Sequence, residues 1–195
     1  MKAKMIKAMV LVGIIVCASS CRTQTGNLSA KETLKFGAGF ASGILFHEVG
    51  HYTVAKMEGM DNVKQHPTKV TYKYDKYNES KKRNIAFGGF VADVISSEIL
   101  MSSDRLFPKD NSFVLGWLTW TIFEPISYTL RHEFSSDGYG DLKDLEDTRV
   151  NSRIVEATLI THSILTYYRL SKNPDFPLYV RTSSGRVYVG TRWRF

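Results

Sequence analysis

Two histidines and a glutamate stand at a spacing that suits metal chemistry. His47 and His51 are four positions apart, and Glu48 directly follows the first. On a helix, positions i and i+4 share a face, so both imidazoles reach one ion from the same side. Zinc held in this way activates water and polarises a carbonyl, while the glutamate takes a proton from the water and passes it to the leaving amine. The His-Glu-x-x-His pattern therefore predicts a zinc-dependent peptidase with Glu48 as general base.

The elements that must position these residues are mostly helical. Apolar spacing predicts four helices, over about 34–57, 85–101, 112–130 and 152–170. Gly59 is expected to end the first helix, and Pro125 to kink or break the third. We expect a mainly α fold, a bundle of about four helices. A small β-strand insertion at 70–74 and a C-terminal β-hairpin with strands 178–181 and 186–189 complete it.

The segment around the motif resembles a known family. The run Ile44-Leu-Phe-His-Glu-Val-Gly-His-Tyr-Thr-Val-Ala-Lys-Met-Glu-Gly59 is similar to the first active-site segment of site-2-protease-like zinc metalloproteases. In that family a His-Glu-x-Gly-His helix is followed by a small residue, here Ala55, and a glycine that ends the helix. The resemblance implies zinc held by His47 and His51. The family takes its third ligand from an aspartate of an Asp-Gly motif, and the nearest match here is Asp137-Gly138.

A catalytic zinc normally has three protein ligands and one open position, so a third ligand must come from elsewhere in the chain. The metzincin pattern would require a glycine and a histidine soon after the motif, but Val54 and Met57 occupy those places. His66, in the strand region, and His162, in the fourth predicted helix, have no ligand-like neighbours. We interpret them as surface or packing histidines.

Four acidic residues remain as third-ligand candidates. Asp141 and Asp137 rank first together, because the glycines of Asp-Gly-Tyr-Gly-Asp let a loop bring carboxylates to an ion; an ordinary turn is the alternative. Glu98 comes next and resembles the glutamate that another zincin branch takes from a following helix. Glu124, the lone charge of an apolar stretch, comes last. Antiparallel counting places Asp93 level with His47, and Glu124 is also level if the third helix runs parallel to the first.

The N-terminus has the layout of a secretory signal peptide. Lysines precede the apolar run Met9–Val16, and small residues then lead to Cys21. Small residues before a cysteine also resemble the lipobox of bacterial lipoproteins, which implies a lipidated Cys21. We expect a signal peptide over 1–20, a tether over 21–33 and a zincin-like helical domain with a C-terminal hairpin over 34–195. Cys17 and Cys21 both lie at the end of the leader, so a disulfide framework is excluded.

The charge of the chain favours export over nucleic-acid binding. The formal net charge is +7, and removal of the three leader lysines leaves 7 − 3 = +4. The basic connector with Lys81, Lys82 and Arg83 is better explained as a solvated edge. We expect a protein of the cell envelope, on the periplasmic side or in the outer membrane. Its expected partners are a peptide or protein substrate and a membrane, reached through lipidated Cys21 or the apolar helices 34–57 and 112–130.

Two functions remain open from the sequence. The first is an envelope zinc metallopeptidase with His47 and His51 as ligands and Glu48 as base. The alternative is a non-catalytic envelope lipoprotein in which the motif holds a structural metal or is vestigial. The motif keeps a glutamate, Glu48, at the position of the general base, which favours the metallopeptidase.

Overall fold

The computed structural model describes residues 30–73, 78–103, 111–134, 140–172, 178–183 and 186–191. The predicted signal peptide, the predicted lipidation site Cys21 and the candidate ligand Asp137 lie outside the described residues. Within the described part the chain is mainly helical with a small antiparallel sheet. The mainly α fold class is therefore confirmed.

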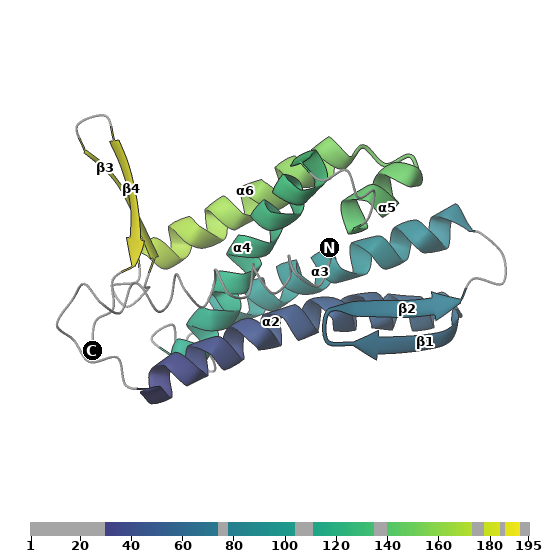
Figure 1. Ribbon diagram of the computed structural model, residues 1–195, viewed down its shortest axis with the longest axis horizontal. Helices are drawn as coiled ribbons and strands as arrows, with labels where there is room; N and C mark the ends of the chain where they lie inside the picture. Colours follow the sequence, from purple (N-terminus) through teal and green to yellow (C-terminus); the bar gives the residue numbers. More distant parts are fainter. Residues whose placement is uncertain are drawn as a thin grey trace.

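The described part contains five helices, whereas the sequence predicts about four. They are α2 (Ala30–Met57), α3 (Glu79–Ser102), α4 (Ser112–Phe134), α5 (Asp141–Asp147) and α6 (Ser152–Ser171). Figure 1 shows α2 and α3 side by side, with α4 and α6 running obliquely past them and the short α5 near α3. Helix α2 is the centre of the packing, since it contacts α3, α4 and the first hairpin.

The strands form two separate hairpins. β1 (Asp61–His66) pairs antiparallel with β2 (Lys69–Lys73), and β3 (Leu178–Ser183) pairs antiparallel with β4 (Arg186–Thr191). β1 has no counterpart in the sequence prediction, because only Val63 of its residues is buried and no alternation is visible. Val63 packs with Ala55, Met60 and Ile85, which holds the first hairpin against the ends of α2 and α3.

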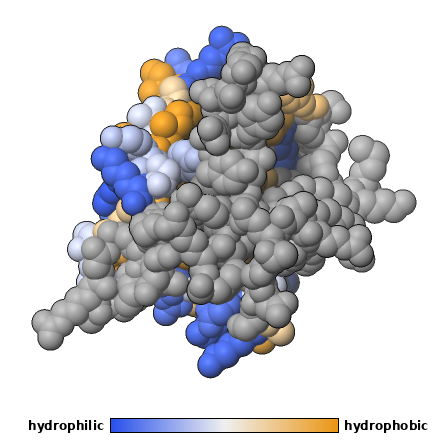
Figure 2. Space-filling model, turned by 90° about the vertical axis from the view of Figure 1, so that its left-hand side faces the viewer, coloured by the Kyte–Doolittle hydropathy of each residue, from blue (hydrophilic) through white to orange (hydrophobic). Residues whose placement is uncertain are grey.

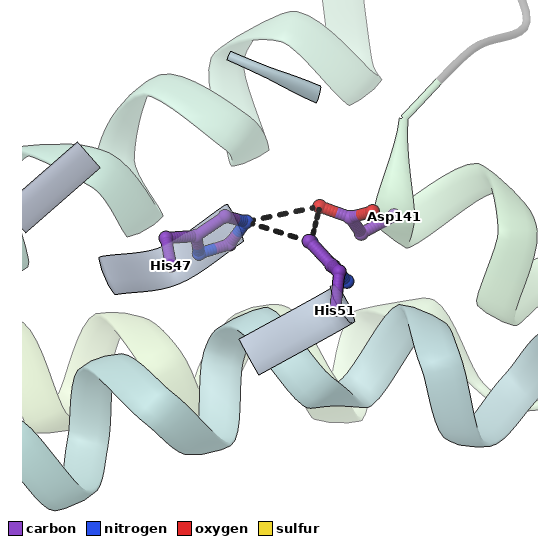
Figure 3. Close-up of side chains that lie close together, drawn as sticks. All are labelled: His47, His51 and Asp141. Carbon is purple, nitrogen blue, oxygen red and sulfur yellow. Dashed lines mark hydrogen bonds and ion pairs between the residues drawn. The ribbon is translucent and has the colours of Figure 1, made fainter. Parts of the chain in front are cut away.

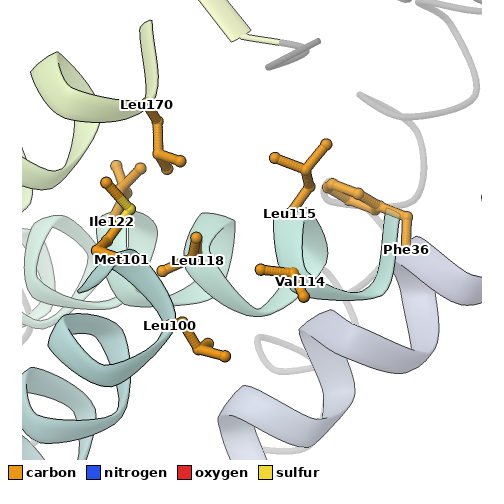
Figure 4. Close-up of a cluster of buried hydrophobic side chains, with 8 residues drawn as sticks. All are labelled: Phe36, Leu100, Met101, Val114, Leu115, Leu118, Ile122 and Leu170. Atoms are coloured by element: carbon orange, nitrogen blue, oxygen red, sulfur yellow. The ribbon is translucent and has the colours of Figure 1, made fainter. Parts of the chain in front are cut away.

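The largest apolar cluster joins α2, α3, α4 and α6 (Figure 4). Its buried members are Phe36, Leu100, Met101, Val114, Leu115, Leu118, Ile122 and Leu170. Burying such side chains contributes roughly 1.5–3 kcal/mol each. The cluster fixes α4 against α2, and α4 continues through Pro125 to Phe134. Pro125 was expected to kink or break this helix; it does not break it, because packing along the helix outweighs the lost backbone hydrogen bond.

Three further boundaries differ from the sequence prediction. α2 begins at Ala30, so the end of the expected tether is helical. α3 begins at Glu79 and includes the basic residues 81–83, because the side chain of Asn78 accepts a hydrogen bond from the Lys81 N–H and caps the helix. The Asp-Gly-Tyr-Gly-Asp segment was expected to be a loop, but its last residue, Asp141, begins helix α5.

Glycines allow α2 and α3 to approach closely. A Cβ added at Gly50 would overlap the carbonyl oxygen of Gly88, and one at Gly88 would lie 2.8 Å from the carbonyl oxygen of Gly50. A Cβ at Gly89 would lie 2.5 Å from ring atoms of both His47 and His51. The backbones therefore meet directly beside the histidine pair.

Large apolar side chains also reach the surface of the helices. On α3, Val91, Ile95 and Ile99 are about half exposed, and Phe123 and Leu130 on α4 are similar. In the view of Figure 2, hydrophobic residues lie beside hydrophilic ones in the described part of this face. Among the described helices, α3 alone is long and apolar enough to cross a membrane by length and composition.

The glycine contact generates the first prediction. Gly50→Ala should lower the free energy of unfolding by about 1–3 kcal/mol, because its methyl group meets the backbone of Gly88. Gly37→Ala in the same helix is the matched control. Among the described residues, no atom outside the adjacent backbone of its own helix lies within 4 Å of the added methyl group, so this substitution should raise stability by about 0.5–1 kcal/mol. Urea unfolding followed by circular dichroism measures both, and equal effects would contradict the close contact.

Candidate metal centre

The histidines of the motif and one aspartate converge on a single point. Nε2 of His47 lies 2.9 Å from Nε2 of His51. Oδ2 of Asp141 lies 3.4 Å from Nε2 of His47 and 3.3 Å from Nε2 of His51. Figure 3 shows these three side chains pointing toward one another. The two imidazoles come from successive turns of α2, and the carboxylate comes from the first residue of α5.

These three ligand atoms could hold a metal ion, and zinc is the ion to compare them with. Ligand atoms about 2.0–2.1 Å from a tetrahedral zinc lie roughly 3.3 Å from one another. Two imidazoles and one carboxylate form a three-ligand set that leaves the fourth position to water or substrate. The ligand atoms of His47, His51 and Asp141 are of the types that zinc binds, and their separations of 2.9–3.4 Å are close to this value.

The short helix α5 delivers the carboxylate, and two kinds of contact hold α5 in place. Leu142 and Leu145 are buried in a cluster with Ala86, Phe90 and Leu159. Lys82 on α3 donates to Asp144 and Asp147 of α5, with both Nζ–O distances at 3.0 Å. Apolar packing and ion pairing thus fix the first residue of α5 opposite the α2 histidines.

The electrostatics of the cluster favour a positive charge at the point of convergence. Burial lowers the pKa of His51, but the charge of Asp141 and the hydrogen bonds to Asp141 and to the Ile85 carbonyl together outweigh this effect and raise that pKa. Burial likewise opposes protonation of His47, yet Glu124 and other groups around it raise its pKa well above the usual range. Burial raises the pKa of Asp141, but the two imidazoles hold it well below its ordinary value. A bound divalent cation would supply the positive charge that this arrangement stabilises.

Glu48 lies in the same buried environment. Its residue exposure is 7%, and burial raises the pKa of its carboxyl group, while the charges of His47 and His51 act in the opposite direction. A carboxyl group whose pKa is raised toward neutrality is suited to accept a proton and to return it. The predicted general base therefore has a suitable environment.

The second ring nitrogen of each histidine has its own partner. Nδ1 of His51 lies 2.6 Å from the carbonyl oxygen of Ile85. Nδ1 of His47 lies 2.6 Å from Oδ2 of Asp93 and 2.5 Å from Oε1 of Glu124. With Nδ1–H as donor in both rings, both Nε2 lone pairs are free for a metal.

The structure separates the four acidic candidates. Asp141 lies with the histidines, and Asp137 is outside the described residues. Glu98 lies away from the site in a partly exposed ion pair with Arg169 of α6, at 2.6 Å. Glu124 reaches His47, but at Nδ1 and not at the nitrogen that faces His51 and Asp141. The structure therefore does not bring Glu98 to the two histidines, and it brings Glu124 to the other nitrogen of His47.

Two of the three remaining histidines, His66 and His162, were assigned from the sequence, and both lie outside the cluster. His66 is exposed in β1, with Nε2 3.4 Å from the Thr71 hydroxyl. His162 on α6 lies 3.3 Å from the Ser97 hydroxyl. Their interpretation as surface and packing histidines agrees with these positions.

Tyr128 and Gly89 border the site and were not predicted. The hydroxyl of Tyr128 lies 3.4 Å from Nε2 of His47, and its ring packs edge-on against Phe90 at 5.4 Å. Burial raises its pKa well above the ordinary value, and the charge of Asp141 adds to this effect. Tyr128 is one helical turn after Glu124, so its position on the same face of α4 was the available signal.

No protein-family model matches this chain, and no curated protein or solved structure shows detectable similarity to it. The resemblance to site-2-protease-like metalloproteases therefore stays a prediction from the motif.

The α5 contacts generate the second prediction. Lys82→Met removes the ion pairs between α3 and α5, so Asp141 should be held less firmly. We expect zinc binding to weaken by roughly two- to fivefold, the effect of a partly exposed ion pair. Lys143→Met is the matched control, because Lys143 pairs with Glu146 and Asp147 within α5 itself. This substitution removes one positive charge, as Lys82→Met does. Competition with a zinc-binding dye measures both, and equal weakening would show that only net charge matters.

Proposed function

We propose that this chain is a zinc-dependent metallopeptidase of the bacterial cell envelope. His47, His51 and Asp141 hold the zinc, and Glu48 acts as general base. The observation that carries the proposal is the convergence of three ligand atoms next to a buried glutamate. Asp141 is preferred to Asp137 as third ligand because it lies at both Nε2 atoms.

The residues divide the chemistry among them. Bound zinc supplies Lewis-acid activation of water and of a peptide carbonyl. Glu48 accepts the proton of the attacking water and passes it to the leaving amine. Tyr128 closes the site beside His47 and places a hydroxyl donor at its edge. Burial of Glu48 and of both histidines limits access of bulk water, which strengthens these electrostatic interactions.

The cell-envelope location is part of the same proposal. It rests on the three-part leader and on the residues before Cys21, which resemble a lipobox. The apolar surface residues of α3 and α4 are compatible with a protein that works at a membrane surface. Its substrate would be a peptide or protein, and nucleic acid is not an expected partner.

The alternative is a non-catalytic lipoprotein with a structural or vestigial metal site. It predicts zinc binding without hydrolysis, or no zinc at all. Structural zinc sites are normally closed by four protein ligands, whereas the described residues offer three on the Nε2 side. This difference favours the enzyme.

Two substitutions test the proposal on the full chain. Glu48→Gln should keep about one equivalent of zinc and lose hydrolysis by roughly 10²- to 10⁴-fold, because only proton transfer is removed. His47→Ala should lose the zinc as well. Metal content by mass spectrometry and cleavage of a quenched fluorescent peptide library provide the readouts. If the wild type binds zinc and cleaves peptides, and the Glu48→Gln variant cleaves them equally well, the assignment of Glu48 as general base would be contradicted.

The lipid anchor has its own test. Cells fed a labelled fatty acid should incorporate the label into the wild-type chain, and Cys21→Ser should abolish incorporation. Cys17→Ser is the control, because Cys17 lies within the predicted leader and should leave labelling unchanged. Equal labelling in both variants would contradict acylation at Cys21 and favour ordinary signal cleavage.

A further inference from the structure

Two buried carboxylates meet the same nitrogen of His47 from two different helices. Asp93 comes from α3 and Glu124 from α4, and their residue exposures are 4% and 1%. Their oxygens lie 2.6 Å and 2.5 Å from Nδ1, on the side of the ring opposite the ligand cluster. Both nitrogens of His47 are therefore engaged, one by the candidate metal ligands and the other by acidic side chains.

The contact with His47 is the interaction that compensates for the burial of these two carboxylates. Oδ1 of Asp93 and both oxygens of Glu124 are buried without a hydrogen-bond partner of good geometry among the described residues. Burying carboxylates is unfavourable unless a specific interaction compensates. The interaction that both share is the approach to Nδ1 of His47.

The two histidines differ in this respect. His51 is oriented by a main-chain carbonyl of α3, which a side-chain change cannot remove. His47 is oriented by side chains alone. The geometry of the candidate site is therefore sensitive to substitution on the His47 side.

We propose that Asp93 and Glu124 are positioning residues that together fix the ring of His47 with Nδ1 as donor and Nε2 as metal ligand. The inference rests on the proposed zinc site. Asp93 is the hydrogen-bond acceptor, since its Oδ2 meets Nδ1 with good geometry. Glu124 places a second acidic group against the same nitrogen and closes off the side that faces α4. Carboxylates behind a ligating histidine raise its basicity and fix its orientation.

The test compares Asp93→Asn, Glu124→Gln and the control Glu98→Gln. Glu98 lies on the same helix as Asp93 but pairs with Arg169. Asp93→Asn should weaken zinc binding by roughly 10- to 100-fold and alter the visible absorption spectrum of the cobalt-substituted protein. Glu124→Gln should change the spectrum in the same direction, whereas Glu98→Gln should leave affinity and spectrum unchanged. Where hydrolysis is measurable, kcat should fall more than KM rises in Asp93→Asn.

A second measurement needs no variant and so does not depend on folding. A nitrogen-15 spectrum of the histidines in the zinc-loaded wild type should show His47 protonated at Nδ1. An unprotonated Nδ1, or wild-type affinity and spectrum in Asp93→Asn, would overturn the proposal. Two bound metal ions, one of which is lost in Glu124→Gln, would replace it with a second cation site at Asp93 and Glu124.

These readouts separate the inference from the proposed peptidase. If the wild type binds zinc but cleaves no peptide, the proposed peptidase activity is contradicted. The positioning role still holds in that case if Asp93→Asn weakens zinc binding. A wild-type protein that binds no zinc would overturn both.

Discussion

The close contact of α2 and α3 at Gly50, Gly88 and Gly89 is the constraint on which the candidate metal centre depends. Any side chain at Gly89 would occupy the space that both imidazoles now fill. At this separation the α3 backbone reaches Nδ1 of His51 through Ile85, and the α3 side chain Asp93 reaches Nδ1 of His47. A wider gap between the helices would remove both contacts and free the rings to rotate.

Helices α4 and α5 pack around this pair of helices and bring the other residues of the site to the histidines. α4 packs along α2 through the main apolar cluster, which brings Glu124 and Tyr128 to His47. α5 brings Asp141 to the opposite edge, held by leucine packing and by Lys82. Each side chain of the centre is therefore carried by a helix, which holds catalytic groups more precisely than a loop does. The site combines local spacing on α2 with contacts between helices distant in sequence.

The difference between local spacing on one helix and contacts between distant helices explains what the sequence could predict. The pair His47 and His51 follows from a spacing of four on one helix. Counting along an antiparallel α3 also places Asp93 level with His47, and counting along α4 does so for Glu124 if α4 runs parallel to α2. In the structure both side chains lie at Nδ1 of His47. Glu98 could not be excluded by counting alone, because its partner Arg169 lies on α6.

Helix α5 was hidden because its two leucines stand in an acid- and glycine-rich segment, where only packing against α3 and α6 reveals them. For the same reason Asp141 could not be separated from Asp137. The helical path of α4 through Pro125 likewise depends on packing that local propensity does not contain.

The central claim is that the two Nε2 atoms and Asp141 bind one zinc ion. X-ray absorption at the zinc edge of the loaded full chain tests it most directly. The account predicts a shell of nitrogen and oxygen donors at about 2.0–2.1 Å, with the multiple scattering of two imidazoles. His51→Ala should lose the scattering of one imidazole or the metal itself. A shell of oxygen donors without imidazole scattering, or one that is unchanged in His51→Ala, would contradict the account.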